Sequence, residues 1–91
     1  MIKEIFKIKN KHGLHARPAA QFVKVAGQFE SNIKVLKDGL EVDGKSIMGV
    51  MMLAAEPGSE IEIHINGGDE EKALQAIKDL VAKDFYDNAK E

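Results

Sequence analysis

The chain has 91 residues, of which 44% are hydrophobic and 31% are charged, with a formal net charge of -2 at pH 7. This composition is typical of a single small globular domain over residues 1–91 and excludes a disordered chain. The absence of cysteine excludes disulfide bonds and thiolate metal sites. Because no apolar run approaches a membrane span and the net charge is slightly acidic, we expect a cytoplasmic protein that binds neither membrane nor nucleic acid.

The first third of the chain predicts a strand that leads into a helix. Residues 2–9 alternate between apolar and mostly lysine positions, which is typical of a half-buried strand. Pro18 fits the first turn of a helix, so a helix should begin near His15 or Ala16, and Gly27 can end it in a left-handed conformation. Its apolar stripe has helical spacing and consists of Ala19, Phe22, Val23 and Ala26.

The middle of the chain predicts a β-hairpin followed by a short helix. Residues 32–37 and 40–42 have the pattern of strands, and Asp38-Gly39 between them is a strong two-residue turn. Ser46 is placed to cap a helix over residues 47–53. A Pro-Gly pair then breaks the chain before the last strand.

The last third predicts a strand and a longer helix. Residues 60–66 alternate strictly, with isoleucines inward and with glutamates and a histidine outward. Asp69 is expected to cap the helix that follows, and residues 84–91 to extend that helix or to fray as a tail. The apolar stripe of this helix consists of Ala73, Leu74, Ile77, Leu80 and Val81.

The elements therefore follow the order β-α-β-β-α-β-α. Because each strand is apolar on one side only, the strands predict an antiparallel sheet with one face covered by helices and the other in water. The expected fold class is α+β, in two layers.

The most unusual stretch of the sequence is residues 13–20, where the first helix begins. The first N–H groups of a helix lack intrahelical partners and, with the helix dipole, favour an anion such as phosphate. His15 is suited to carry a proton or a phosphoryl group there, and Arg17 supplies a cation with a planar donor fork. The other histidines, His12 and His64, are expected at the surface, and no ligand cluster supports a metal site.

A second unusual stretch is the short helix over residues 47–53, which is apolar nearly all round. Either this helix is deeply buried or its outer face docks partners, and we favour docking because methionine side chains adapt to several partners. Ser46 before it is either a helix cap alone or also a phosphorylation switch, and both possibilities stay open. The expected core face consists of Val50, Leu53 and Ala54. The expected docking face consists of Ile47, Met48 and Met51.

Residues 13–19, 45–51 and 57–61 together resemble the histidine-containing phosphocarrier family, HPr, of the bacterial phosphoenolpyruvate:sugar phosphotransferase system. The resemblance covers nearly the whole chain, up to about Val81. It implies an open-faced β-sandwich, with four antiparallel strands and three helices on one face. It also implies a monomeric phosphoryl carrier that is not an enzyme and needs no cofactor.

The same resemblance implies a role for each matching residue. His15 would be phosphorylated by enzyme I and discharged to the IIA components of sugar permeases, with Arg17 stabilising the phosphoryl group. Ser46 would be the site of an ATP-dependent HPr kinase/phosphorylase. The docking face defined above would serve enzyme I, IIA and a transcriptional regulator.

Two features depart from the family pattern, namely His12, where the family usually has a small polar residue, and the extra residues 84–91.

Three alternatives remain for the function. A related carrier in nitrogen or other regulation would use the same chemistry. A small phosphatase lacks a second acid, base or metal cluster near His15, and a nucleic-acid module is disfavoured by the 5% aromatic content and the net acidity.

Overall fold

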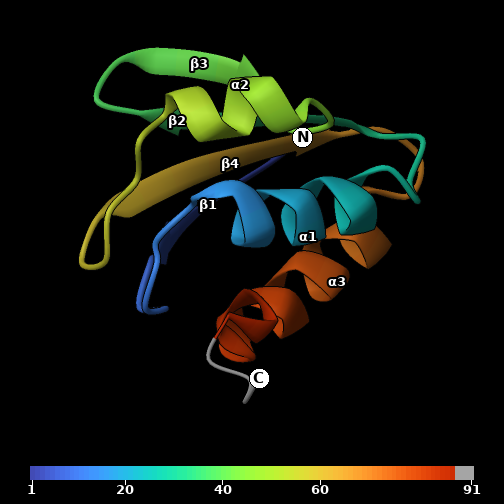
Figure 1. Ribbon diagram of the computed structural model, residues 1–91. Coiled ribbons are helices and arrows are strands. Elements are labelled where there is room, and N and C mark those ends of the chain that lie inside the picture. The colour runs from blue at the N-terminus through green and yellow to red at the C-terminus, as the bar shows by residue number, and fades with distance from the viewer. Residues whose placement is uncertain (88–91) are drawn as a thin grey trace.

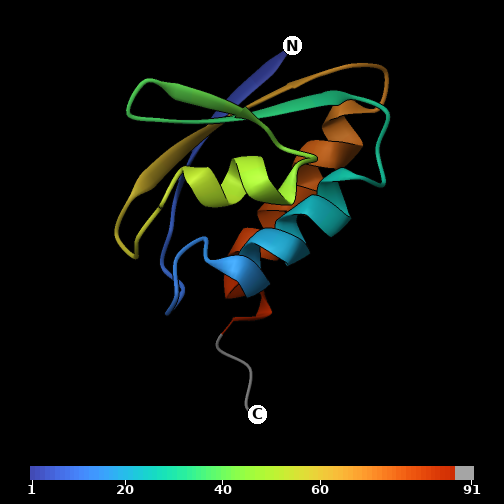
Figure 2. The same cartoon turned by 45° about the horizontal axis from the view of Figure 1, so that its top comes forward.

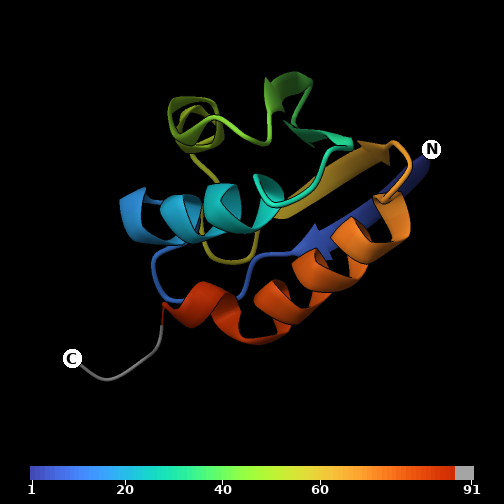
Figure 3. The same cartoon turned by 90° about the vertical axis from the view of Figure 1, so that its right-hand side faces the viewer.

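Across residues 1–87, which are the residues that the computed structural model describes, a four-stranded antiparallel sheet packs against three α-helices (Figure 1). The helices lie on one face of the sheet and leave the other face open (Figure 3). The predicted α+β fold, an open-faced sandwich in the order β-α-β-β-α-β-α, is confirmed. The strands are β1 (Ile2–Lys7), β2 (Asn32–Lys37), β3 (Leu40–Asp43) and β4 (Glu60–Asn66). The helices are α1 (Ala16–Ala26), α2 (Ile47–Met52) and α3 (Glu70–Ala82), followed by the short turn η1 (Asp84–Tyr86).

The central strand β4 shows how the alternating pattern builds the core. The sheet order is β1-β4-β2-β3, so β4 has a partner on each side. Ile61, Ile63 and Ile65 are buried, as predicted, and Ile65 pairs with Ile2 of β1 and with Ile33 of β2. Cross-strand neighbours of this kind form one continuous apolar surface, on which the helices pack.

Helices α1 and α3 bury most of their predicted stripes against this surface. Phe22 of α1 and Ile77 of α3 are almost fully buried. Val23 and Leu74, which were expected in the same stripes, are only partly buried because they lie at the margins of the core. The hydrophobic spacing therefore located both buried faces but overestimated their width.

The short helix α2 lies beside α1 and contacts β3 (Figure 2). Val50 and Leu53 are buried, as predicted. The prediction was wrong for Ala54, which is exposed, while Ala55 is fully buried in its place. The backbone of Ala54 has a φ of 50°, so the helix has already ended there and helical spacing no longer applies.

The predicted ends of three elements met different outcomes. The hairpin turn is confirmed, since Asp38 and Gly39 have φ values of 51° and 86°, as a turn of this type requires. Strand β1 ends at Lys7, because Ile8 bonds through its N–H to the Ser59 carbonyl in a loop. The prediction for Gly27 was wrong: its φ is -68°, because α1 ends in tightened right-handed turns that need no left-handed residue.

Asp69 stands before α3, but the prediction that its side chain caps this helix was wrong. Its carboxylate instead accepts hydrogen bonds from the backbone N–H of Glu30 at 2.9 Å, and from the N–H and hydroxyl of Ser31. The hydrogen bonds from Ser31 and Glu30 lower the pKa of Asp69 below its usual value. A tertiary contact has displaced the local cap and ties the start of α3 to the loop before β2.

After α3 the chain folds back onto the domain. Asp84, Phe85 and Tyr86 have positive φ values of 54°, 56° and 58°, a conformation that non-glycine residues adopt only at a cost. The burial of Phe85 in the core offsets that cost. Of the tail expected over residues 84–91, residues 84–87 pack on the domain, and residues 88–91 lie outside the described residues.

Candidate functional site

The loop before α1 is fixed by Gly13. This residue has a φ of 59°, and a Cβ atom placed on it would lie 2.1 Å from the carbonyl oxygen of Ala55. The N–H of Leu14 donates a hydrogen bond of 2.8 Å to that same carbonyl, and the Leu14 side chain is buried. The loop therefore runs directly against the segment that follows α2, and only glycine permits so close an approach.

His15 occupies the residue before the first turn of α1. Its extended backbone (φ -73°, ψ -169°) lets its carbonyl accept the N–H of Ala19 at 2.9 Å, while its side chain makes no capping hydrogen bond. The ring is 59% exposed, and its Nε2 lies 3.8 Å from a carboxylate oxygen of Glu56, which is itself mostly in water. An exposed, loosely held imidazole at a helix start is available for chemistry with an anionic reactant.

Arg17 and His15 line the same shallow depression, together with Pro18 in the first turn. Arg17 is exposed there, and Pro18 is buried and has no N–H to offer. The first turn of α1, Arg17 and His15 therefore border one open patch of surface. The structure thus brings together the two residues that the sequence singled out for phosphoryl chemistry.

The sequence interpretation missed Asp87, which lies at the rim of that depression. Its carboxylate accepts hydrogen bonds from the N–H of His12 at 2.7 Å and from the side-chain amide of Asn10 at 3.0 Å. The Nδ1 atom of His12 lies 2.9 Å from the other carboxylate oxygen. Burial acts to raise the pKa of Asp87, but the hydrogen bonds from Asn10 and His12 outweigh it and hold the pKa below its usual value.

The same carboxylate organises the loop through Asn10. This side chain is fully buried and also donates a hydrogen bond of 2.7 Å to the carbonyl of Gly13. No local sequence signal predicted the contact, because Asn10 and Asp87 are 77 positions apart. The red C-terminal segment passes directly beside the blue loop before α1 (Figure 3).

Ser46 caps α2, as predicted, because its hydroxyl oxygen accepts the N–H of Gly49 at 3.0 Å. The expected docking face is exposed rather than buried, with Met48 at 73% of its full accessible surface. Met52, which the sequence interpretation left out, is 66% exposed and extends this face. The helix is only six residues long, so its outer surface includes its last residue. We define the α2 face as Ile47, Met48, Met51 and Met52.

We call the loop before α1 and its first turn, residues 13–18, the His15 corner. The α2 face and the His15 corner meet at a second depression. Met51 and Ala54 line it from one side and His15 and Ala16 from the other, and Glu56 lines it as well. Helices α1 and α2 are in contact along this boundary (Figure 2). Met51 is thus the member of the α2 face that shares a depression with His15.

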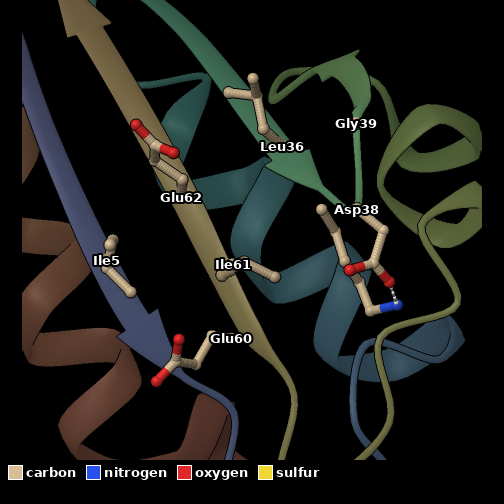
Figure 4. Close-up of a pocket in the computed structure, with 8 residues that line it drawn as sticks. Ile5, Leu36, Asp38, Gly39, Glu60, Ile61 and Glu62 are labelled. Carbon is tan, nitrogen blue, oxygen red and sulfur yellow. Dashed lines mark hydrogen bonds and ion pairs between the residues drawn. The ribbon is translucent and has the colours of Figure 1, made fainter.

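The open face of the sheet carries a separate depression with none of the candidate residues (Figure 4). Ile5 projects there from β1, and Glu60 and Glu62 from β4. His64 lies on this face, and its Nε2 is 2.7 Å from a Glu62 carboxylate oxygen. In the described part of the chain, no group of three potential ligands is placed to hold a metal ion.

Comparisons with known proteins identify the family and the fold. A family model described as "PTS HPr component phosphorylation site" matches residues 2–83. The phosphocarrier protein HPr of Neisseria meningitidis serogroup A is 48% identical over 81 residues, covering 89% of this chain and 91% of the relative.

Two solved structures extend the comparison to three dimensions. A crystal structure of HPr from Thermoanaerobacter tengcongensis has a TM-score of 0.90 and 47% identity, and covers 93% of this chain and 96% of that one. Crh of Bacillus subtilis, described as a domain-swapped dimer, has a TM-score of 0.72 and 41% identity, covering 91% of this chain and 95% of that one. The resemblance inferred from the motifs is therefore confirmed, and the chain belongs to the HPr family of phosphocarrier proteins.

Proposed function

We propose that this chain carries a phosphoryl group on His15 between enzyme I and the IIA components of sugar permeases in the cytoplasm. A lone pair of the His15 ring forms the new bond to phosphorus while the bond between phosphorus and the donor breaks, and the donor atom keeps that electron pair. The second transfer repeats this step with IIA as acceptor. The chain acts as a covalent intermediate between transferases and has no catalytic turnover of its own.

The observation that carries this proposal is the exposed ring of His15 at the start of α1, beside Arg17. The Nε2 atom faces the Glu56 carboxylate at 3.8 Å, so Nδ1, the nitrogen that the family resemblance implies, is the atom turned away from that negative charge. Arg17 and the N–H groups of the first helical turn stabilise the charge of the transferred group. An open depression lets the group leave as readily as it arrives.

The α2 face supplies the docking surface in this proposal. It is apolar, exposed and joined to the His15 corner at Met51, so enzyme I, IIA and a transcriptional regulator can use it in turn. We propose that the carrier works as a monomer, although the Crh relative is described as a dimer. Within residues 1–87, no helix is both long and apolar enough to cross a bilayer.

Phosphorylation of Ser46 by an HPr kinase/phosphorylase is the regulatory part of the proposal. The Ser46 hydroxyl already faces the N–H of Gly49, and a phosphate there places negative charge directly beside Ile47 and Met48. Charge at that edge disfavours docking of an apolar or acidic partner surface. The cap and the switch are thus compatible roles for one side chain.

The experiment that tests the carrier role combines the chain with phosphoenolpyruvate and enzyme I. We expect one acid-labile phosphate on the wild type and on the control His64→Ala, and none on His15→Ala. A phosphate that persists on His15→Ala, or a wild type that takes up none, contradicts the proposal. A carrier in nitrogen regulation, the alternative to sugar uptake, would take the phosphate from a different donor and reject sugar-specific IIA.

A companion experiment tests Ser46 with HPr kinase and ATP. We expect an acid-stable phosphate that is absent from Ser46→Ala and present on Ser59→Ala. Ser59 is a matched control because its hydroxyl oxygen also accepts a backbone N–H, that of Glu56 at 3.1 Å. If the wild type stays unmodified, Ser46 is a helix cap only.

A further inference from the structure

His12 has a specific partner in the structure. The imidazole of His12 is held by Asp87, with Nδ1 2.9 Å from one carboxylate oxygen, and the backbone N–H of His12 donates to the other oxygen at 2.7 Å. Asp87 is almost fully buried, whereas the His12 side chain is 54% exposed. One end of the ring is therefore anchored and the other end projects toward solvent.

The anchored ring borders the same depression as His15 and Arg17. With Nδ1 engaged by the carboxylate, Nε2 is the ring nitrogen left for a further partner. A carboxylate that accepts from Nδ1–H fixes the plane of an imidazole, and in the protonated ring Nε2–H is a donor as well.

We propose that His12 is a second phosphoryl-binding group of this carrier, whose Nε2–H contacts the phosphate on His15, and that Asp87 is its positioning residue. This inference rests on the proposed function, because it requires a phosphoryl group on His15. It assigns a role to His12 and to the C-terminal segment that folds back beside it.

The buried carboxylate of Asp87 is compatible with a phosphate in this depression. One of its oxygens is turned toward Nδ1 of His12, and the other accepts from Asn10 and from the backbone of His12. These three contacts all run to Asn10 and His12 in the loop before α1. The exposed side chains that line the depression are those of His12, His15 and Arg17.

Two substitutions separate the phosphate contact from the anchoring contact. In His12→Asn the side-chain amide stands near the former Nδ1, so it still donates to Asp87 but has nothing at the Nε2 position. In His12→Gln the amide reaches the former Nε2 position and the donor to Asp87 is lost. Urea unfolding should therefore leave His12→Asn close to the wild type, so a defect of this variant in phosphoryl binding is not a folding defect.

The test is a competition for phosphate. Equimolar wild type and His12→Asn are mixed with catalytic enzyme I and limiting phosphoenolpyruvate, and intact-mass spectrometry measures the phosphorylated fraction of each chain at equilibrium. We expect the wild type to take about three- to fivefold more phosphate, the size of a half-exposed ion pair, and His12→Gln to recover part of the difference. Equal shares of phosphate overturn this inference while leaving the proposed function intact. Absence of phosphate from both chains overturns the proposed function and this inference with it.

The same competition at two pH values tests the charge on His12. The groups that face this ring are Asp87 on the C-terminal segment and His15 and Arg17 at the start of α1, with Glu56 across from His15. Only the protonated ring donates from Nε2 while Nδ1 donates to Asp87, so the advantage of the wild type should shrink as the pH rises. An advantage that grows with pH contradicts the contact.

The positioning role of Asp87 has its own spectroscopic readout. Long-range ¹H–¹⁵N spectra should show a protonated Nδ1 on His12 in the wild type and its loss in Asp87→Asn, with an accompanying loss of phosphate share. His64 serves as the internal reference, because its Nε2 pairs with Glu62 on the open face of the sheet. An Asp87→Asn chain that keeps the His12 tautomer and the full phosphate share excludes Asp87 as a positioning residue.

Discussion

The His15 corner and the α2 face lie side by side but are built in opposite ways. The corner is held by polar contacts, with Gly13 pressed against Ala55 and with the Asp87 carboxylate fastened to the loop. The α2 face is held from beneath by Val50 and Leu53, and its methionines project outward. A reacting group requires fixed geometry, whereas a surface for several partners requires adaptable side chains. In the function proposed above, separate segments of one small surface therefore supply the two requirements.

The largest effect expected on stability comes from removing the support beneath α2. Leu53→Ala should lower the free energy of unfolding by about 2 to 5 kcal/mol, because Leu53 is 4% exposed and its loss leaves a cavity. The exposed neighbour Met48 is the matched control, and Met48→Ala should change stability by less than about 0.5 kcal/mol. Urea denaturation measures both. Similar losses for the two variants would contradict the division of α2 into a core face and an outer face.

The next effect concerns the polar corner. Gly13→Ala should destabilise the fold by about 2 to 3 kcal/mol, because it combines an unfavourable φ with a clash against the Ala55 carbonyl. Gly39→Ala isolates the backbone part, since Gly39 also has a positive φ but open space around it, and should cost about 1 kcal/mol. Thermal unfolding measures the stability of both variants, and the difference between Gly13→Ala and Gly39→Ala is the cost of the clash. If Gly13→Ala is no worse than Gly39→Ala, the close approach does not fix the corner.

A smaller effect tests the Asp87 contacts through pH. Asp87→Asn should lose about 1 to 3 kcal/mol at neutral pH, because hydrogen bonds to a charged acceptor are replaced by weaker ones. The folded-state pKa of Asp87 lies below the unfolded value near 3.8, so its stabilisation is present above pH 3.8 and is lost as the pH falls through the lower folded pKa. Plots of the free energy of unfolding against pH for the wild type and Asp87→Asn should therefore converge at acid pH. If the two plots stay parallel down to acid pH, the charge of the Asp87 carboxylate contributes nothing to stability.

The smallest effect belongs to the boundary between the two regions. Ser46→Ala should cost about 0.5 to 1 kcal/mol, because it removes the acceptor for the Gly49 N–H at the start of α2. Circular dichroism during urea denaturation measures the change. Ser46→Asp keeps an acceptor and should retain most of the stability while weakening docking to the α2 face. A Ser46→Asp variant that binds partners as the wild type does would separate Ser46 from docking.

Much of the fold followed from local patterns, and the reason lies in particular residues. Ile61, Ile63 and Ile65 alternate strictly, and a strand buried on one face has no other way to satisfy that pattern. Asp38-Gly39 specified its turn because few residue pairs accept two positive φ values. These features depend on neighbours in sequence, so they can be predicted without the structure.

The predictions for Gly27 and Ala54 failed at the ends of helices, but the failures that matter most for the site involve residues whose partners are distant in sequence. Asp69 was assigned a local cap, but Ser31 and Glu30 compete successfully for its carboxylate. Asp87 could not be recognised at all, because its partners Asn10 and His12 lie at the other end of the chain. At the candidate site, the proximity of His15 and Arg17 was predictable from one helix start. The contribution of Asp87 to the lining of their depression was not.

The central claim is that chemistry at the corner and docking on the α2 face are separable parts of one surface. The most direct test is the rate of phosphoryl transfer from enzyme I, measured against carrier concentration, for Arg17→Gln and Met48→Ala. We predict that Arg17→Gln lowers the maximal rate and that Met48→Ala raises the concentration needed for half of it, with the maximal rate unchanged. A Met48→Ala chain that transfers like the wild type, or two variants that change the same parameter, would contradict the claim.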